Sequence, residues 1–90
     1  MQLAGRVSLV TGAGVRLGRA LALSLAERGS DVAVHYHRSE GPAREVVEQI
    51  RALGRRAVAV PLDLAQDQGY GELVSRVVDS LGSLDVLINS

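Results

Sequence analysis

A glycine-rich stretch near the start of the chain, residues 9–20, has the residue types and spacing that bind a phosphate group. Gly12, Gly14 and Gly18 let the backbone turn tightly and come close to a ligand, because no Cβ blocks a positive φ or the approach. The helix-like sequence that follows would direct unpaired N–H groups and the positive end of its dipole at the turn. Glycines also serve ordinary tight turns, but a glycine turn between a strand and a helix predicts a pyrophosphate site held by the backbone.

A second polar stretch lies where the residue that faces the adenosine ribose is expected, about twenty positions past the glycines. Counting on from Gly18 leads to Arg38, and no carboxylate follows before Glu40. Arginine presents planar donors that match phosphate oxygens, and Ser39 adds a hydroxyl. Arg16, inside the glycine turn, could reach the same 2′-phosphate from the other side, so the sequence favours NADP(H) over NAD(H). The alternative is that Arg38 is an ordinary solvated loop residue.

Two histidines precede this arginine. Strand alternation would place His35 and His37 on one face and Tyr36 on the opposite face. His37 is a candidate cofactor-binding residue, although both histidines could be merely strand-end residues. No metal site is predicted, because no third ligand is suggested nearby.

Apolar runs alternate with amphipathic segments along the whole chain. The runs predict strands at residues 7–10, 32–36, 57–62 and 84–88, and the segments predict helices at residues 17–28, 42–53 and 68–81. Continuous apolar strands indicate a parallel sheet with both faces covered. Right-handed crossovers then give the strand order 3-2-1-4, the β-α-β-α-β-α-β first part of a doubly wound, Rossmann-type α/β fold.

Each expected helix has an apolar face. We expect the buried residues to be Ala20, Leu21, Ser24 and Leu25 in the first helix, Ala43, Val46, Val47, Ile50 and Leu53 in the second, and Leu73, Val74, Val77, Val78 and Leu81 in the third.

Composition limits the function classes. A chain of 90 residues forms one small domain, and its formal net charge of zero suggests neither a nucleic-acid nor a membrane surface. There is no long apolar span and no charged-then-apolar leader, so we expect a cytoplasmic location. The absence of cysteine excludes disulfides and thiolate chemistry.

These motifs together resemble those of the short-chain dehydrogenase/reductase family. The resemblance rests on Thr11-Gly12 followed by Gly18, on Asp63 after the third strand and on Asn89 at the end of the fourth. In the family the first motif reads TGxxxGxG, and here Arg16 replaces its middle glycine. With the HYHRS sequence of residues 35–39, the motif is similar to the pteridine reductases, a branch that reduces pterins with NADPH.

The resemblance implies roles for further residues. Asp63 would meet the adenine amino group and Leu64 would border the ring, although Asp63 could instead cap the next helix. Asn89 would lie near the adenine ribose and steady the central strands, and Thr11 would tie the first turn to this region by hydrogen bonding. Leu17, in the glycine motif, completes the candidate set.

The family's catalytic residues are not found in this sequence. Family members use a tyrosine proton donor four residues before a lysine, and this chain has no lysine, so no catalytic residue is predicted. We therefore expect residues 1–90 to be a single dinucleotide-binding domain, truncated before the catalytic region of a parent that transfers hydride to a carbonyl or pterin-type imine. A small-molecule substrate would bind only in a full-length parent. The alternative is a non-catalytic nucleotide-binding or interaction module.

The fourth strand leaves one edge of the expected sheet open. Its backbone groups are a template for a further strand, and a sheet of this size has little stability to spare. We therefore expect the chain to self-associate through that edge as a homo-oligomer, to pair with a missing C-terminal half, or to aggregate.

Overall fold

The computed structural model describes residues 2–14, 16–65 and 69–90. Strands and helices alternate strictly along the chain. The elements are β1 (Val7–Thr11), α1 (Arg16–Glu27), β2 (Asp31–Tyr36), α2 (Glu40–Ala52), β3 (Ala57–Pro61), α3 (Gly69–Leu81) and β4 (Val86–Asn89).

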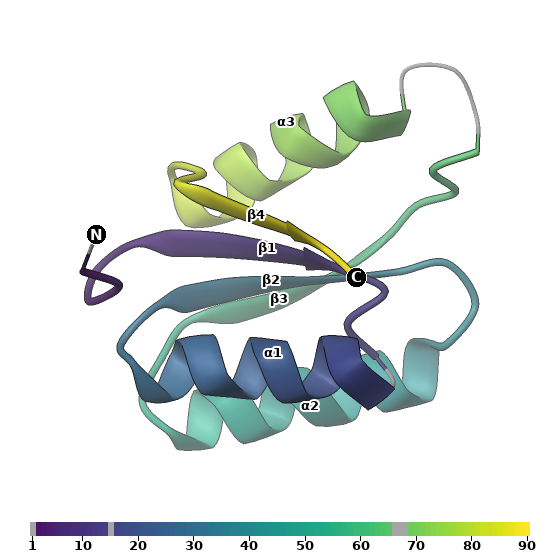
Figure 1. The fold of residues 1–90 in the computed structure, drawn as a ribbon. Coiled ribbons are helices and arrows are strands. Elements are labelled where there is room, and N and C mark those ends of the chain that lie inside the picture. Colours follow the sequence, from purple (N-terminus) through teal and green to yellow (C-terminus); the bar gives the residue numbers. More distant parts are fainter. Residues whose placement is uncertain (1, 15, 66–68) are drawn as a thin grey trace.

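The four strands form one parallel sheet in the order β3-β2-β1-β4, which confirms the predicted topology. In this register Thr11 lies beside Asn89 and Tyr36 lies beside Pro61. Figure 1 shows β1 and β4 pointing to the same end of the sheet, and the parallel pairing gives β2 and β3 the same direction. The residues that follow the strands therefore meet at one edge, where ligands bind in open α/β sheets.

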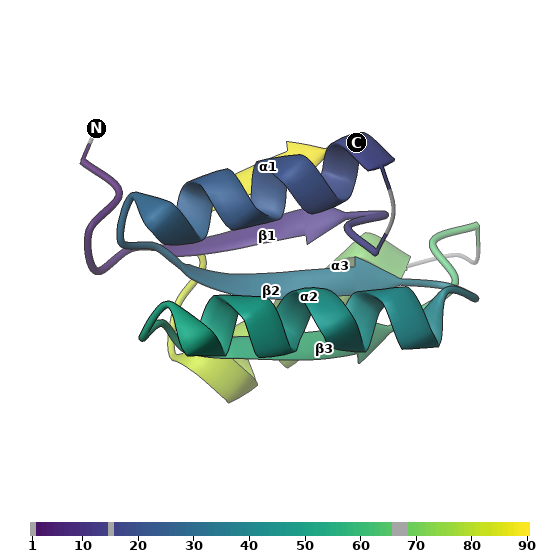
Figure 2. The same cartoon turned by 90° about the horizontal axis from the view of Figure 1, so that it is seen from below.

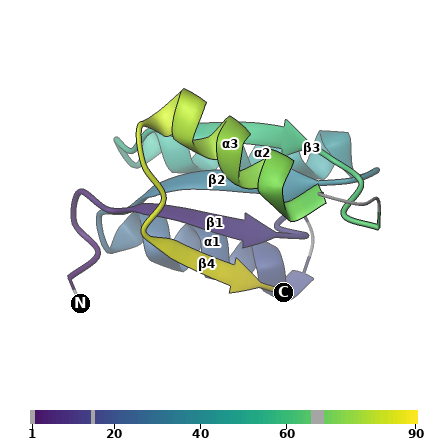
Figure 3. The ribbon, with the colours of Figure 1, turned by 90° about the horizontal axis from the view of Figure 1, so that it is seen from above.

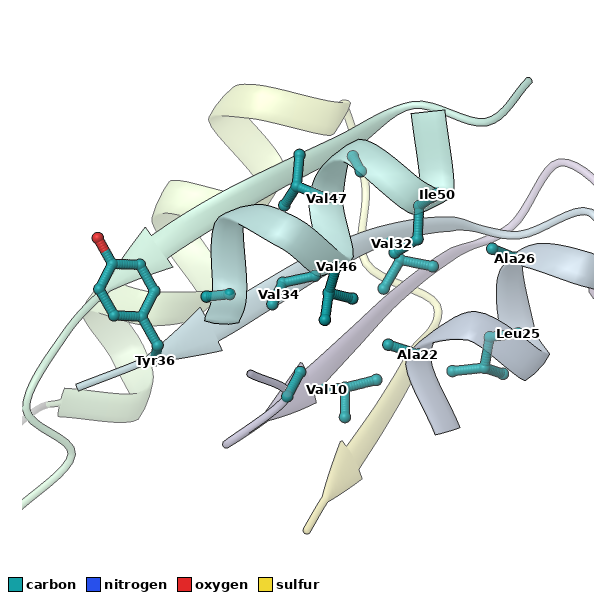
Figure 4. Close-up of a cluster of buried hydrophobic side chains, with 13 residues drawn as sticks. Val10, Ala22, Leu25, Ala26, Val32, Val34, Tyr36, Val46, Val47 and Ile50 are labelled. Carbon is teal, nitrogen blue, oxygen red and sulfur yellow. The ribbon is translucent and has the colours of Figure 1, made fainter. Parts of the chain in front are cut away.

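Helices α1 and α2 cover one face of the sheet (Figure 2). Their buried residues form an apolar cluster with the side chains of β1 and β2 that point to this face (Figure 4). Val46 and Ile50 of α2 are fully buried there, and burying a side chain of this kind stabilises the fold by about 1.5–3 kcal/mol.

The predicted buried face of α1 was wrong in part. The buried residues are Gly18, Ala22, Leu25 and Ala26, whereas Ala20 and Ser24 are exposed and Leu21 is half-buried. The helix is rich in alanine and leucine on all sides, so its apolar pattern does not fix a single face. Only packing against β1 and β2 selects the one that carries Ala22 and Ala26.

Helix α3 packs on the opposite face of the sheet (Figure 3). Leu73, Val77 and Leu81 are buried in a second cluster with Val7 and Leu9, as predicted. The expectation for Val78 was wrong, because this side chain is 39% exposed. The predicted apolar face of this helix therefore included one residue that is exposed.

Several element boundaries also differ from the prediction. Helix α2 begins at Glu40, two residues before the expected Pro42, so the proline lies in its first turn, where a missing N–H is tolerated. Leu53 follows the end of α2 and is 47% exposed, not buried as expected. Strand β4 begins at Val86. The expected first residue of the third helix, Gln68, lies outside the described residues.

Candidate functional site

The glycine turn connects β1 to α1 at the carboxyl end of the sheet, as predicted. Gly12 has a φ of +61°, which favours glycine. A Cβ on Gly18 would overlap the carbonyl oxygen of Gly12 and would come 2.9 Å from the Cα of Ala13. The first turn of α1 therefore lies directly against the backbone of the turn, and only glycine permits this contact.

Arg16, the first residue of α1, has a φ of +50°. It is the one non-glycine residue with a positive φ in the part of the chain that the structure describes. The family motif places glycine at this position, and the positive φ gives the physical reason. An arginine here bears a backbone cost of about 1–2 kcal/mol that glycine would not. The neighbouring Leu17 is 67% exposed beside the same turn.

The polar stretch after β2 meets the glycine turn. Gly12, Gly14, Tyr36, His37 and Ser39 line a small cavity of about 50 Å³. Four of these five residues belong to the predicted site, although they come from two separate stretches of the sequence. The structure thus places the expected phosphate turn beside the expected ribose-phosphate stretch.

Ser39 precedes α2 but does not cap it with its side chain. Its carbonyl oxygen accepts a hydrogen bond from the N–H of Ala43 at 3.0 Å, whereas its hydroxyl makes no capping bond. Gly14 lies close by, since a Cβ on it would come 3.1 Å from the Ala43 nitrogen. The Ser39 hydroxyl is therefore available to a ligand bound between the turn and α2.

Two arginines contribute positive charge to this region. Neither Arg16 nor Arg38 forms an ion pair with another described residue, and both are exposed. Six of the other eight arginines do pair with a described carboxylate, as Arg44 does with Glu40 at 3.1 Å and Arg56 with Asp31 at 2.9 Å. Arg28 and Arg55, far from the glycine turn in sequence, form no ion pair with a described residue either. The site region therefore holds two cations that no described carboxylate neutralises.

Asp63 follows β3 and faces His37 across the same edge of the sheet. Its carboxylate lies 3.7 Å from His37 Nε2, and its Oδ1 accepts a hydrogen bond from the N–H of Ala65 at 2.9 Å. The alternative in which Asp63 caps the next helix is wrong, because α3 begins only at Gly69. Leu64 is half-buried and packs against the apolar cluster under α3.

Thr11 and Asn89 join β1 to the edge strand β4 at their carboxyl ends. The Thr11 hydroxyl donates to Asn89 Oδ1 at 2.7 Å and accepts from the N–H of Ser90 at 3.2 Å. The hydrogen bond expected of Thr11 is present. Tyr70, which belongs to none of the sequence motifs, also donates its hydroxyl to Asn89 Oδ1, at 3.1 Å.

The contacts of His35 at this edge of the sheet were not predicted from the sequence. Its ring is buried and accepts a hydrogen bond from the N–H of Gly12 at Nδ1, 3.2 Å away. Its Nε2 lies 2.8 Å from the carbonyl oxygen of Leu62. The available signal was a polar residue near the end of an otherwise apolar strand, which the alternation rule assigns to the α3 face.

A larger surface depression lies on α2, away from this edge. It has a volume of about 420 Å³ and is lined by Gly41, Arg44, Glu45, Glu48 and Gln49. Its charged residues are already paired, since Arg44 contacts Glu40 and Glu48 contacts Arg51. It therefore offers less unbalanced charge to a ligand than the carboxyl end of the sheet does.

Two further features of the described residues bear on the site. No group of three or more His, Asp or Glu side chains among them could hold a metal ion. None of the helices in these described segments is long and apolar enough to cross a bilayer.

Comparison with known proteins identifies close relatives of this chain. Residues 6–90 match the family model described as short chain dehydrogenase. The L-rhamnose 1-dehydrogenase (NAD(P)(+)) of Sphingomonas sp. strain SKA58 is 43% identical over 88 residues, which are 98% of this chain and 35% of that protein. The short-chain dehydrogenase/reductase homolog YusS of Bacillus subtilis strain 168 is 36% identical over 90 residues, which are all of this chain and 83% of YusS.

The fold is similar to that of a solved relative with a bound dinucleotide. A short chain dehydrogenase from Burkholderia cenocepacia J2315 in complex with NADP has a TM-score of 0.90 and 42% sequence identity to this chain. The match covers 97% of this chain and 36% of that one. The chain thus spans about a third of the length of this protein and of the rhamnose dehydrogenase.

Proposed function

Since the chain belongs to the short-chain dehydrogenase/reductase family of NAD(P)-dependent oxidoreductases, we propose that residues 1–90 are a single domain that binds NADP(H) in preference to NAD(H). The observation that carries this proposal is two exposed arginines without a described carboxylate partner, Arg16 at the start of α1 and Arg38 between two residues that line the cavity at the glycine turn. A 2′-phosphate would be held by these guanidinium groups, by the Ser39 hydroxyl and by His37. NADP bound to the Burkholderia relative supports the same cofactor.

The remaining candidate residues would each contact a different part of the cofactor. The N–H groups of the glycine turn and of the first turn of α1, from Gly14 to Gly18, would hold the pyrophosphate. Asp63 and Leu64 would border the adenine, and Asn89 would lie near its ribose. For Asp63 this role requires the carboxylate to exchange its contact with His37 for the adenine amino group.

For the parent protein we propose hydride transfer to a carbonyl or a pterin-type imine. The bound nicotinamide would supply the hydride, and the resemblance of residues 35–39 to the pteridine reductases supports the pterin branch. These 90 residues contain no lysine, so a Tyr-x-x-x-Lys proton donor and the substrate loops would have to come from further sequence. In this chain the function is cofactor binding.

Calorimetric titration of the chain with NADP⁺ and with NAD⁺ tests the cofactor. We expect NADP⁺ to bind at least about tenfold more tightly, since charge-assisted hydrogen bonds to the 2′-phosphate contribute about 1.5–3 kcal/mol. Equal affinities for the two dinucleotides would overturn the NADP(H) assignment.

The alternative is a non-catalytic nucleotide-binding or interaction module. The chain spans 83% of YusS, so a relative not much longer than this chain exists, and this supports the alternative. The DNA downstream of codon 90 distinguishes the two, because an open frame that encodes Tyr-x-x-x-Lys supports the reductase. An intact-mass measurement on purified protein then shows whether a 9.5 kDa form is produced.

We also propose that the chain self-associates through the outer edge of β4. On the other edge of the sheet, Arg51 and Arg76 donate to the outward carbonyl oxygens of Ala57 and Pro61, each at 2.9 Å. Among the described residues, no side chain covers the backbone of β4 in this way, and Leu87 is 48% exposed. An open edge beside exposed apolar surface favours pairing with another strand.

Sedimentation over a concentration series measures this association. We expect the mass to rise above the 9.5 kDa of one chain. Val86→Pro, which removes an outward N–H at the first residue of β4, should lower the association. A monomer at all concentrations would contradict the proposal.

A further inference from the structure

His35 is a buried polar side chain near the end of a strand that is otherwise apolar. It is 5% exposed, and it lies on β2, the strand between β1 and β3. Both of its ring nitrogens are engaged, one with the glycine turn after β1 and the other with the residue after β3. One side chain therefore bridges the segments that follow both neighbouring strands.

The two contacts fix the tautomer of the ring. The N–H of Gly12 can only donate, so Nδ1 of His35 must be the acceptor and carry no proton. The proton then lies on Nε2, which donates to the carbonyl oxygen of Leu62 at 2.8 Å. A neutral imidazole with this tautomer satisfies both partners at once.

We propose that His35 is a positioning residue that fixes the glycine turn relative to the carboxyl end of β3. This inference rests on the proposed function, because these two segments carry the pyrophosphate and the adenine parts of the cofactor site. Leu62 directly precedes Asp63, so the ring sets the separation between the phosphate turn and the adenine-binding segment. Cofactor affinity then depends on a side chain that does not itself touch the cofactor.

The backbone of His35 provides an internal reference for the effect of its ring. The carbonyl oxygen of His35 accepts from the N–H of Ala13 at 3.1 Å, and this bond does not depend on the side chain. Replacing the ring by alanine would leave the N–H of Gly12 without its acceptor while the Ala13 bond remains possible. A selective change at Gly12 is therefore the signature of the ring contact, whereas general loosening would affect both amides.

The same contacts determine which amides remain for a phosphate. The N–H groups of Gly12 and Ala13 are both occupied by His35, one by its ring and one by its carbonyl oxygen. The donors to the pyrophosphate must then come from later in the turn and from the start of α1. Addition of NADP⁺ should consequently leave the Gly12 and Ala13 amides bonded to His35.

The test compares the wild-type chain with three variants, His35→Ala, His35→Asn and Ser8→Ala. Asparagine retains an oxygen acceptor for Gly12 but is too short to reach Leu62 as well. Ser8→Ala is the matched control, because Ser8 is fully buried and bonded to Ser30 at 2.7 Å, at the opposite end of the sheet. The measurements are ring ¹H–¹⁵N correlation spectra, amide hydrogen exchange and NADP⁺ affinity.

We expect the wild-type ring to carry its proton on Nε2. His35→Ala should raise the exchange rate of the Gly12 amide selectively and weaken NADP⁺ binding about tenfold, the effect of one or two lost hydrogen bonds. His35→Asn should recover part of the affinity and of the Gly12 protection. Ser8→Ala should lower thermal stability without either effect.

Three results would overturn the inference. They are a ring protonated on Nδ1, unchanged Gly12 exchange in His35→Ala, and an equal loss of NADP⁺ affinity in Ser8→Ala. The ring spectrum is recorded on the wild-type chain, so it tests the predicted tautomer of His35 even if His35→Ala does not fold. If the wild-type chain binds no NADP⁺, the proposed function fails, while the spectrum and the Gly12 exchange still test the bridge.

Discussion

The polar side chains at the two ends of the sheet differ in whether they have hydrogen-bonding partners within the protein. At the amino end, the side chains of Ser8, Ser30 and Asp31 bond to one another, to the backbone or to Arg56. At the carboxyl end, Arg16, Arg38 and the Ser39 hydroxyl have no such partner among the described residues, although other side chains there are hydrogen-bonded. Both ends belong to the same four strands, so their apolar cores are shared. The difference separates residues that stabilise the fold from residues that are kept for a ligand.

Two groups of hydrogen bonds connect the strands at the amino end. Ser8 and Ser30 share a buried hydrogen bond, and Ser30 also donates to the carbonyl oxygen of Arg6 at 3.1 Å. Asp31 accepts from the N–H and the Nε of Arg56 at 2.9 and 3.0 Å. Buried polar groups with partners cost the fold little, and these groups also join β1, β2 and the start of β3.

The carboxyl end holds groups that the fold itself does not need. Arg16 adopts a positive φ, and Arg38 is exposed between His37 and Ser39, which line the cavity at the turn. Residues with a strained backbone, as Arg16 has, are concentrated at functional sites. Substitutions at this end should change cofactor affinity, and substitutions at the amino end should change stability.

Gly18→Ala should have the largest effect, because it tests the closest backbone contact of the carboxyl end. The added Cβ would overlap the Gly12 carbonyl oxygen, so the turn or the start of α1 must shift. We expect a loss of NADP⁺ affinity of about a hundredfold, from about 3 kcal/mol of overpacking at the site. Gly41→Ala is the control, since a Cβ there meets nothing within 4 Å and should leave binding unchanged. Similar affinities for the two variants would mean that the turn adapts.

Arg38→Asp should affect binding but not stability. Reversing the charge removes a charge-assisted contact to the 2′-phosphate and repels it, so NADP⁺ affinity should fall about tenfold or more while relative NAD⁺ use improves. Arg28→Asp makes the same charge change at the far end of α1, where Arg28 is exposed and has no ion pair with a described residue. An equal loss of NADP⁺ affinity in both variants would indicate a general charge effect and remove Arg38 from the site.

Asp31→Ala should show the opposite behaviour at the amino end. It removes the acceptor of two hydrogen bonds from Arg56, one of them from a backbone N–H, and should lower the free energy of unfolding by about 1–2 kcal/mol. NADP⁺ affinity should stay within about twofold once the folded fraction is taken into account. Glu27→Ala removes an exposed carboxylate without a described ion pair and should change stability by less than about 0.5 kcal/mol. A loss of NADP⁺ affinity in Asp31→Ala would contradict the assignment of stability to the amino end and of cofactor binding to the carboxyl end.

The sequence predicted the fold well because its strands are continuous apolar runs. Val32 to Tyr36 is buried throughout, as a parallel strand covered on both faces requires. The buried face of α1 was predicted poorly, since alanine and leucine occur all round the helix and only the neighbouring strands select one side. The candidate site residues were predicted from motifs that are local in sequence.

The bridge made by His35 could not be read from the sequence. Its two ring partners are Gly12 and Leu62, which are 23 and 27 residues away and come together only when β1 and β3 both pair with β2. The same limit applies to the contact between Tyr70 in the first turn of α3 and Asn89 at the end of β4. Contacts of this kind follow from the strand order, not from any spacing along the chain.

Arg16→Gly should have the smallest effect. It is nevertheless informative, because the substitution should raise the free energy of unfolding while it lowers NADP⁺ affinity. Glycine relieves the positive φ, and this relief exceeds the added entropy of the unfolded chain, so stability should rise by up to about 1 kcal/mol. NADP⁺ affinity should fall about threefold to tenfold, since one of the two cations near the 2′-phosphate is lost. Arg16→Ala is the matched control, because alanine removes the same charge but keeps the strain, so it should lose affinity without the gain in stability. Calorimetric titration and urea unfolding of both variants measure the two quantities. Unchanged NADP⁺ affinity in both variants would mean that the Arg16 side chain does not contribute to cofactor binding. The contrast between the two ends of the sheet would then depend on Arg38 and Ser39 alone.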